Sequence, residues 1–248
     1  MKKIVLIGCT GSIGRQVIDV VNRHPDEYAI CALVAGCDSE LFRKQVAALK
    51  PEYYAASSID RDYALSLAEL DSADIVFNAA SGFAGLEYSV KAICAGKRLA
   101  LANKETLVCG GEFITALAER HGAEIIPVDS EHSAIWQCLS FDRHAPLKRL
   151  IITASGGAFR GYTAEMLKGV TAEQALNHPT WKMGAKITVD SATLMNKGYE
   201  VIEAHVLYGT PYSRIDTVIQ PQSIIHSMTE FYDGAILAQM SYPTMEIP

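Results

Sequence analysis

The chain has 248 residues, of which 49% are hydrophobic and 20% are charged, and its net charge is −6 at pH 7. This length suits one large or two ordinary globular domains, and the apolar content excludes a disordered protein. The acidic balance argues against a nucleic-acid-binding protein, which usually carries a basic face.

The six cysteines include no Cys-x-x-Cys pair, which excludes ordinary zinc-finger spacing, and their pattern is not that of a disulfide framework. Residues 1–7 hold too short an apolar run for a signal peptide, and no segment is long enough to span a membrane. We therefore expect a cytoplasmic protein without a membrane partner.

Short apolar runs alternate with amphipathic stretches through the first half of the chain. The runs predict buried strands at Ile4–Ile7, Ala29–Ala35, Asp74–Asn78, Leu99–Ala102 and Glu124–Val128. The stretches between them predict helices near Ile13–Arg23, Ser39–Leu49, Arg61–Leu70, Leu86–Ala95 and Glu112–His121. Such alternation is typical of a parallel sheet covered on both faces, so we predict an α/β, Rossmann-like, dinucleotide-binding domain over residues 1–128.

The pattern changes in the second half, residues 129–248, for which we predict an α+β domain. A strand at Leu150–Thr153 is followed by a polar stretch, Ser155–Gly184, and by a helix from about Ala192 to Leu207. Later apolar runs predict strands at Thr217–Ile219, Ile224–Phe231 and Ala235–Met240. The last two would form a hairpin about Tyr232-Asp233-Gly234. The chain ends directly after a strand-like run, which indicates a fragment of a longer protein.

The glycine-rich segment Gly8 to Gly14, GCTGSIG, lies between the first predicted strand and the first predicted helix. Glycines there allow a tight turn and a close approach of the backbone to a pyrophosphate, while the helix start directs free N–H groups at the anion. The spacing is G-x-x-G-x-x-G rather than G-x-G-x-x-G, so a turn that serves packing alone is the alternative. The position of the motif favours a dinucleotide.

The end of the second predicted strand, Ala35 to Asp38, is where such domains choose between NADH and NADPH. Asp38 could accept hydrogen bonds from a ribose hydroxyl, or it could cap the following helix. No Arg or Lys stands at that point, although Arg43 and Lys44 follow one turn into the helix. These residues alone leave the choice of nucleotide open.

Two carboxylates, Asp129 and Glu131, follow the strand predicted at Glu124–Val128. In an extended chain, residues i and i+2 point the same way, so both carboxylates can face one point. Oxygen ligands without cysteine favour Mg²⁺ or Mn²⁺. The alternative is that Asp129 and Ser130 only cap the helix that follows.

Lys104 follows the strand predicted at Leu99–Ala102, at an edge of the sheet where open parallel sheets bind their ligands. Its ammonium could hold an anionic or carbonyl oxygen. An exposed helix start without a ligand is the alternative.

A second polar group lies in the segment Asp190–Glu200. A helix from about Ala192 would place four polar side chains on one face: Thr193, Asn196, Lys197 and Glu200. Leu194 would lie on another, core-facing side. The polar face suits a phosphorylated, metal-bound substrate, and a solvated surface with a weak Lys-Glu pair is the alternative.

Two further segments offer donors. Ser155-Gly156-Gly157 provides a hydroxyl and a close backbone approach to an anion. Residues 177–184, Asn-His-Pro-Thr-Trp-Lys-Met-Gly, have the composition of a mobile lid. His178 within it is as consistent with a structural role as with a catalytic one.

Taken in order, these segments resemble the 1-deoxy-D-xylulose 5-phosphate reductoisomerase family. The motifs are GCTGSIG at 8–14, LANKE at 101–105, PVDSEH at 127–132, SGG at 155–157, NHP at 177–179, VDSAT at 189–193, MNKG at 195–198 and PQSIIHSM at 221–228. The resemblance implies an NADP-dependent oxidoreductase that uses NADPH and Mg²⁺ or Mn²⁺, with Co²⁺ as a further option. The implied reaction rearranges and reduces 1-deoxy-D-xylulose 5-phosphate, a small sugar phosphate, to 2-C-methyl-D-erythritol 4-phosphate in the non-mevalonate route to isoprenoids. A homodimer is implied as well.

The resemblance also implies roles for individual residues. The metal ligands would be Asp129, Glu131 and Glu200. The catalytic residues would be Lys104, Asp129, Glu131, His178 and Glu200, and the substrate-binding residues would be Ser130, Ser155, His178, Ser191, Asn196 and Lys197. The nucleotide would contact Thr10, Gly11, Ser12, Ile13, Gly36, Cys37, Asp38, Asn103, Glu105 and Gly184.

Two departures keep alternatives open. The family often carries a basic or neutral polar pair where this chain has Cys37-Asp38, so NADPH and NADH both remain candidates. Family chains also continue into a C-terminal helical domain, which we expect to be absent here, so a non-catalytic nucleotide-binding fragment is one alternative. Another Rossmann oxidoreductase, such as a semialdehyde dehydrogenase, is a second, although it would need a catalytic cysteine or a site without a three-carboxylate cage.

Overall fold

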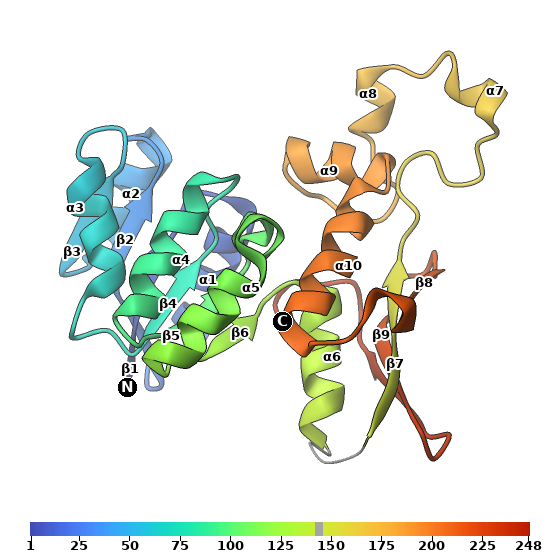
Figure 1. Ribbon diagram of the computed structural model, residues 1–248. Helices are drawn as coiled ribbons and strands as arrows, with labels where there is room; N and C mark the ends of the chain where they lie inside the picture. Colours follow the sequence, from blue (N-terminus) through green and yellow to red (C-terminus); the bar gives the residue numbers. More distant parts are fainter. Residues whose placement is uncertain (142–145) are drawn as a thin grey trace. The chain divides into compact units, whose positions relative to one another are not determined.

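The computed structural model describes residues 1–141 and 146–248, and the chain divides into two compact units, Met1–Asp129 and Ser130–Pro248 (Figure 1). The elements of the first unit are β1 (Lys2–Ile7), α1 (Ser12–Arg23), β2 (Tyr28–Ala35), α2 (Glu40–Leu49), β3 (Tyr53–Ala56), α3 (Arg61–Ser66), η1 (Leu67–Glu69), β4 (Ile75–Asn78), α4 (Ala84–Cys94), β5 (Arg98–Leu101), α5 (Lys104–His121) and β6 (Ile125–Pro127).

The six strands of the first unit form one parallel sheet in the order β3-β2-β1-β4-β5-β6. This order joins two βαβαβ halves at β1, as in dinucleotide-binding domains, and ligands bind where the strand order reverses. Ile7 at the end of β1 lies opposite both Val34 of β2 and Asn78 of β4, so the loops after β1 and β4 start side by side. The predicted Rossmann-like fold is confirmed.

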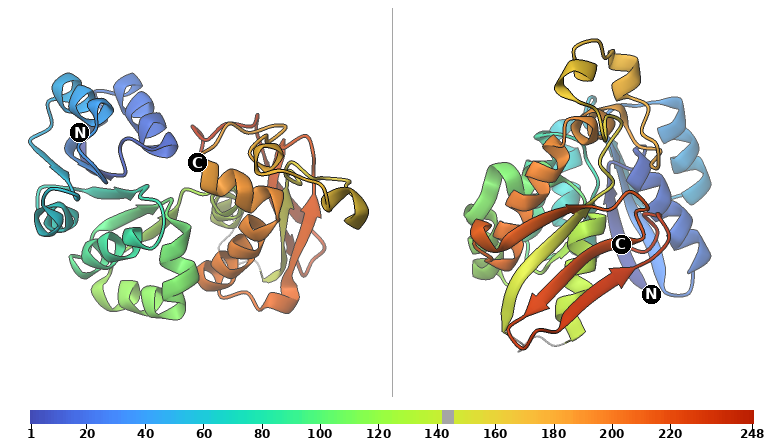
Figure 2. Two further views of the ribbon diagram at one scale, coloured as in Figure 1. Left: turned by 90° about the horizontal axis from the view of Figure 1, so that it is seen from above. Right: turned by 90° about the vertical axis from the view of Figure 1, so that its right-hand side faces the viewer.

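Alternating side chains of the first sheet fill two separate layers of core. Ile4 and Leu6 of β1 pack with Ile18 of α1 and Phe42 of α2. Val5 lies on the opposite face, and it is fully buried. Figure 2 shows α1 and α2 on one side of the sheet and α4 and α5 on the other. Near-continuous apolar strands such as β1 and β2 are therefore required, because neither face meets water.

The second unit begins with a helix and contains a mixed sheet. Its elements are α6 (Ser130–Phe141), β7 (Leu147–Ala154), α7 (Ala164–Leu167), α8 (Ala172–Ala175), α9 (Ala185–Ala192), α10 (Met195–Tyr208), η2 (Tyr212–Arg214), β8 (Ile215–Ile219), β9 (Ile225–Phe231) and β10 (Ile236–Met240). The strand order is β10-β9-β7-β8, with β8 parallel to β7 and the other pairs antiparallel. In the described part of the chain, no helix is both long and apolar enough to cross a membrane.

Helices α6 and α10 cover one face of the second sheet. Ile135 of α6 and Ala204 of α10 pack against Leu150 and Ile152 of β7 and against Ile215 of β8. All five side chains are buried. This layer packs both helices on β7 and β8.

Three sequence predictions for the elements are wrong. Strand β3 was missed, because Tyr53–Ala56 is short and becomes a strand only by pairing along β2. The helix expected from Glu112 begins at Lys104, since Gly111 with φ 47° interrupts it without ending it. The helix expected from about Ala192 is two helices, because α9 ends at Ala192 and Leu194 takes φ 60° before α10 begins.

Gly14 gives a test of how closely α1 packs on the glycine loop. A Cβ atom at Gly14 would lie 2.3 Å from the carbonyl oxygen of Gly8, so Gly14→Ala should destabilise the first unit by about 2 kcal/mol or more, despite the better helix propensity of alanine. Gly198→Ala in α10 is the matched control, because no atom lies within 4 Å of the added Cβ, and it should stabilise by about 0.5–1 kcal/mol. Urea unfolding followed by circular dichroism measures both. Equal stability of Gly14→Ala and the wild type would contradict the packing argument.

Candidate functional site

The loop between β1 and α1 is shaped for an anion. Gly8 has φ +80°, and a Cβ atom there would lie 2.4 Å from the carbonyl oxygen of Ala79, which follows β4. The Gly11 N–H donates to the Gly8 carbonyl oxygen at 3.0 Å, and Gly11 is the N-cap of α1 without a side-chain cap. The first N–H groups of α1, from Ser12 and Ile13, therefore remain available to a phosphate, beside the exposed Gly11.

The end of β2 carries an ion pair. Arg43 of α2 donates from Nε and from an Nη atom to the two carboxylate oxygens of Asp38, at 2.9 and 2.6 Å. The hydrogen bond from Arg43 holds the pKa of Asp38 below its ordinary value. Ser39, not Asp38, caps α2, because its Oγ accepts from the Phe42 N–H at 3.2 Å. Of the two roles predicted for Asp38, helix capping is therefore wrong.

Asn103 is only 2% exposed, and its side chain is fully engaged by the protein. Its Oδ1 caps α5 by accepting from the Thr106 N–H at 3.0 Å, and its Nδ2 donates to the carbonyl oxygens of Ala80 and Gly82 at 2.8 and 2.9 Å. Glu105 also accepts from Nδ2, at 3.1 Å. Asn103 thus shapes the loop after β4, and its side chain reaches that loop rather than open solvent.

Three carboxylates meet where the two units join in the chain. Oxygen atoms of Asp129, Glu131 and Glu200 lie within 4.8 Å of one another, and Glu200 is buried. Asp129 and Glu131 are separated by a single residue. They were predicted to point the same way on an extended chain, but the chain is not extended there, because α6 begins at Ser130. Close carboxylates repel one another unless a cation intervenes, and an all-oxygen set suits Mg²⁺ or Mn²⁺.

Two lysines supply positive charge to these carboxylates. Lys104, at the start of α5, pairs with Asp129, and both side chains are largely shielded from solvent. Lys197 of α10 pairs with Glu200 and lies 3.4 Å from Glu131, and it also donates to the Thr153 carbonyl oxygen at the end of β7. Lys104 thus compensates charge at Asp129, and Lys197 compensates charge at Glu131 and Glu200.

The orientation of Glu200 is set by its neighbours on α10 and α6. Asn196 donates from Nδ2 to Glu200, one helical turn away, while its buried Oδ1 accepts from no donor among the described residues. An unsatisfied buried oxygen on the side chain that contacts Glu200 fits a site that is completed by a cation or a ligand. His132, fully buried, contacts the Glu200 carbonyl oxygen at 2.9 Å and so ties α6 to α10. The sequence reasoning assigned His132 no role.

A second polar group surrounds the end of β7. A Cβ atom at Gly157 would lie 2.3 Å from the carbonyl oxygen of Ser191, so the Ser155-Gly156-Gly157 turn packs against the end of α9. Ser155 Oγ lies 3.0 Å from His178 Nε2, and Arg160 donates to the Ser155 carbonyl oxygen at 2.8 Å. The structure therefore brings Ser155, His178 and Ser191 close to the strand end that Lys197 contacts.

His178 has a defined tautomer. Its Nδ1 accepts from the backbone N–H groups of Thr180 and Trp181 at 3.0 and 2.9 Å, so the ring proton lies on Nε2 and points to Ser155 Oγ. Burial, and then the nearby Arg160, lower the pKa of His178, which keeps the ring neutral at pH 7. The Ser155 hydroxyl, accepting from His178, keeps its own proton for an anionic ligand.

Other predicted positions are less clearly placed. Gly184 is the exposed N-cap of α9 in the second unit, so its contact with a nucleotide stays a prediction. Thr193 lies before α10 and bonds to carbonyl oxygens of α9 instead of sharing the polar face of Asn196. Leu194 is 44% exposed, so its predicted core position is wrong, because its left-handed conformation resets the phase of the helix.

Comparisons with known proteins identify the family of the chain. Family profiles of 1-deoxy-D-xylulose 5-phosphate reductoisomerase match residues 4–66 and 58–111, and the profile of its C-terminal domain matches residues 125–208. The reductoisomerase of Pelotomaculum thermopropionicum is 47% identical over 100% of this chain and 69% of its own length. The chain belongs to the 1-deoxy-D-xylulose 5-phosphate reductoisomerase family.

Solved structures of the reductoisomerase family have the same fold. A DOX-P reductoisomerase in complex with NADPH, fosmidomycin and magnesium superimposes with a TM-score of 0.89 at 35% identity, and it matches 99% of this chain and 67% of its own. The Zymomonas mobilis enzyme in complex with NADPH has a TM-score of 0.83 at 38% identity, over 99% of this chain and 68% of its own. The predicted family is thereby confirmed.

Cys9 does not suit the role of a cysteine nucleophile. It is the cysteine of the glycine loop, and it is fully buried. Burial raises the pKa of its thiol to about 12, so the thiolate needed for nucleophilic attack is absent at neutral pH. The alternative of a semialdehyde dehydrogenase gains no support from this residue.

The lowered pKa of His178 predicts a pH-dependent turn. Protonation of Nδ1 would remove the acceptor of the Thr180 and Trp181 N–H groups. Because the folded pKa lies below the ordinary value of 6.5, the unfolded turn binds the proton more tightly, and the turn loses stability as the pH falls below 6.5. In NMR, His178 should titrate with a midpoint below 6.5, assigned with His178→Gln, and the backbone amide signal of Trp181 should shift over the same range.

Labelling with ¹⁵N-tryptophan gives an internal control, because the chain has two tryptophans and Trp136 lies in α6. Its backbone amide should not follow the His178 titration. A His178 midpoint above 6.5 would contradict the assigned tautomer and neutral state.

Proposed function

We propose that the chain carries the nucleotide, metal and substrate sites of a cytoplasmic 1-deoxy-D-xylulose 5-phosphate reductoisomerase. The reaction would convert this sugar phosphate to 2-C-methyl-D-erythritol 4-phosphate, in the non-mevalonate route to isoprenoids. The first unit, to about residue 128, would bind NADPH, and the second would bind the metal and the sugar phosphate. The observation that carries the proposal is the carboxylate group Asp129, Glu131 and Glu200 with Lys197 beside it.

The residues present fit a divalent cation and a phosphate. A cation held by Asp129, Glu131 and Glu200 meets only oxygen ligands, which favours Mg²⁺ or Mn²⁺ and admits Co²⁺. The phosphate would be held by five polar residues of the second unit: Ser155, His178, Ser191, Asn196 and Lys197. Support comes from the solved relatives whose complexes contain NADPH and magnesium.

The metal would supply Lewis-acid polarisation of the substrate oxygens, and NADPH would supply the hydride. Lys104 would hold Asp129 in place and contact substrate, and Ser130, which donates to Glu131 at 2.7 Å, would orient that carboxylate and bind a substrate hydroxyl. Ser155 would donate to the phosphate while accepting the Nε2 proton of His178. Closure of the segment around Trp181 would exclude water from the intermediate aldehyde.

The nucleotide would lie over the glycine loop. Thr10 to Ile13 would meet the pyrophosphate, Gly36 to Asp38 the adenosine ribose, and the loop held by Asn103 and Glu105 would border the nicotinamide half. Gly184 would contribute from the start of α9. A nucleotide-binding chain without catalysis is the competing proposal.

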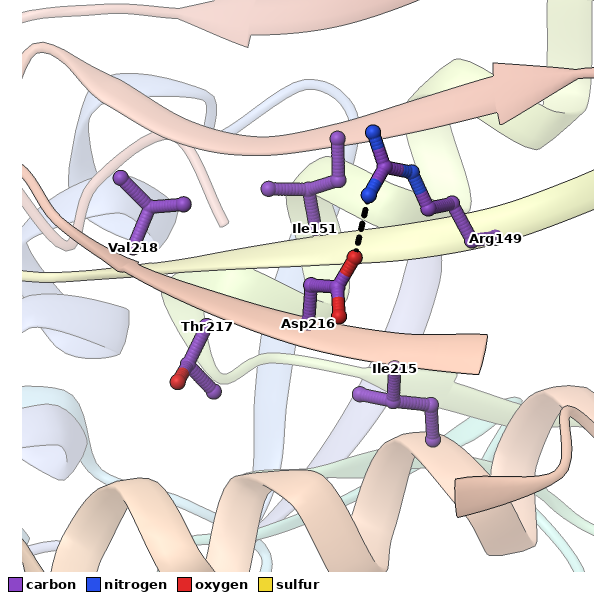
Figure 3. A pocket seen from close by; sticks show the side chains of 6 residues that line it. All are labelled: Arg149, Ile151, Ile215, Asp216, Thr217 and Val218. Carbon is purple, nitrogen blue, oxygen red and sulfur yellow. Dashed lines mark hydrogen bonds and ion pairs between the residues drawn. The ribbon is translucent and has the colours of Figure 1, made fainter. Parts of the chain in front are cut away.

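A homodimer is proposed through the outer face of the second sheet. Register places Ile151, Val218, Met228 and Ile236 on the face opposite α6 and α10, and Val218 and Ile236 are 45% and 53% exposed. A pocket of about 490 Å³ lies there, lined by Arg149, Ile151, Ile215, Asp216, Thr217 and Val218 (Figure 3). Arg149 pairs with Asp216 and Glu230 on either side, so the charges of this face are already compensated and its apolar side chains are free to pack.

Charge-neutralising variants test the metal site. Asp129→Asn, Glu131→Gln and Glu200→Gln should each lower metal-dependent NADPH consumption with 1-deoxy-D-xylulose 5-phosphate by about 100-fold or more, because a direct ligand matters at least as much as its orienting neighbours. NADPH affinity, measured by fluorescence, should stay nearly unchanged. Glu165→Gln, in the exposed helix α7, is the matched control and should keep full activity.

Full activity of all three variants would contradict the assignment of Asp129, Glu131 and Glu200 as metal ligands. Tight NADPH binding by the wild-type chain, with no turnover at any Mn²⁺ concentration, would instead favour the non-catalytic alternative.

The dimer has its own test. Light scattering during gel filtration should give twice the chain mass of 26.9 kDa for the wild type and a shift toward 26.9 kDa for Val218→Glu, because a buried unpaired carboxylate disfavours association. Ile59→Glu, at a 73% exposed aliphatic residue of the first unit, should leave the dimer intact. A monomeric wild type would contradict the proposal.

A further inference from the structure

The pair Asp38–Arg43 occupies the point where dinucleotide-binding domains recognise the adenosine ribose. An acidic side chain there accepts from the ribose 2′-hydroxyl of NADH, whereas a nearby arginine accommodates the 2′-phosphate of NADPH. This chain has both residue types, and they bind each other in a bidentate pair at 2.9 and 2.6 Å. Both carboxylate oxygens of Asp38 are therefore already engaged, so a ribose hydroxyl would have to compete with a guanidinium for them.

Arg43 has donors to spare. The pair uses one N–H of Nε and one N–H of an Nη atom, so three of the five N–H groups of the guanidinium are not used by Asp38. The Arg43 side chain is 70% exposed, while that of Asp38 is 30% exposed. A planar guanidinium with a free edge matches the geometry of a phosphate, and it remains charged at any physiological pH.

The helix that carries Arg43 is anchored to the glycine loop. Gln45 donates from Nε2 to the Cys9 carbonyl oxygen at 2.9 Å, and Phe42 is buried in the core beneath α2. At the end of β2, the Gly36 carbonyl oxygen accepts from the Ser58 N–H at 3.1 Å. The base of the Arg43 side chain is thus held at a set position relative to both the pyrophosphate loop and the end of β2.

We propose that Arg43 is the residue that selects NADPH over NADH by binding the 2′-phosphate, and that Asp38 is the residue that positions it. This inference rests on the proposed binding of NADPH by the first unit. Cys37 in the Gly36–Asp38 segment carries no positive charge that could bind the phosphate. Arg43, which lies outside this segment in α2, would supply that charge instead. Asp38 would then fix the orientation of the Arg43 guanidinium, and its negative charge would not prevent the 2′-phosphate from binding.

Calorimetric titration with two nucleotides that differ only in the 2′-phosphate isolates this contact. Adenosine 2′,5′-bisphosphate should bind Arg43→Ala about 10- to 100-fold more weakly than the wild type, while AMP should bind both equally. Arg43→Lys keeps the charge but loses the fork, so its loss should be intermediate. Lys44→Ala removes the adjacent, 72% exposed charge and should change neither affinity by more than about twofold.

Asp38→Ala separates positioning from simple electrostatics. Removing a negative charge near a phosphate should raise the affinity for the bisphosphate if Asp38 only repels it. If Asp38 orders Arg43, the affinity should fall about threefold or more, because the freed side chain must be immobilised on binding. In an assay of the enzyme, the KM for NADPH should then rise relative to the KM for NADH.

The outcomes are distinguishable. Equal weakening of AMP and the bisphosphate in Arg43→Ala, or no weakening of either, would overturn the role of Arg43 while leaving NADPH binding in place. Stronger bisphosphate binding by Asp38→Ala would overturn the positioning role. A wild-type chain that binds neither nucleotide would overturn the proposed function itself.

Discussion

Three carboxylates within 4.8 Å of one another are the constraint on which the second unit depends. Like charges at this distance repel strongly, and a buried Glu200 cannot relieve the repulsion by turning into water. Lys197 relieves part of it, and its position is set by three acceptors from different elements: Glu200, Glu131 and the Thr153 carbonyl oxygen. The contact of α10 with the end of β7 and the start of α6 is therefore electrostatic as well as apolar.

The packing beneath the carboxylates makes this arrangement specific. His132 and Tyr208 cross-link α6 and α10, since the His132 ring meets the Glu200 carbonyl oxygen and the Tyr208 hydroxyl donates to the His132 carbonyl oxygen at 2.6 Å. Ile135 and Ala204 close the apolar layer between the same two helices and the sheet. A ligand residue on α10 is thus held by contacts that involve no ligand, which is how a site retains its geometry before a metal binds.

The first unit relies on backbone geometry instead of charge. Gly8 and Gly14 allow the turn, the loop after β4 and the start of α1 to approach within contact distance. The buried side-chain amide of Asn103 holds the loop after β4 and caps α5 at the same time. The start of α5, where Lys104 lies, and the loop after β4 are therefore held by the same side chain.

Patterns that depend on neighbours in sequence were readable in advance. The apolar runs of β1, β2 and β4, the glycine loop and the closeness of Asp129 to Glu131 all follow from spacing over a few residues. The helix start at Lys104 was not readable in this way, because the chain is non-helical at Gly111 and is helical again beyond it, and α5 packs against α4.

By itself, the sequence determined the strand–helix alternation, the family and the identity of the candidate ligands, because local periodicity and residue chemistry carry that information. Only the tertiary structure decided that Tyr53–Ala56 is a strand, that Leu194 turns the chain before α10 so that Lys197 meets the end of β7, and that Arg43 reaches Asp38. These outcomes depend on sheet order, helix phase and side-chain direction, which are set by contacts between segments distant in the chain.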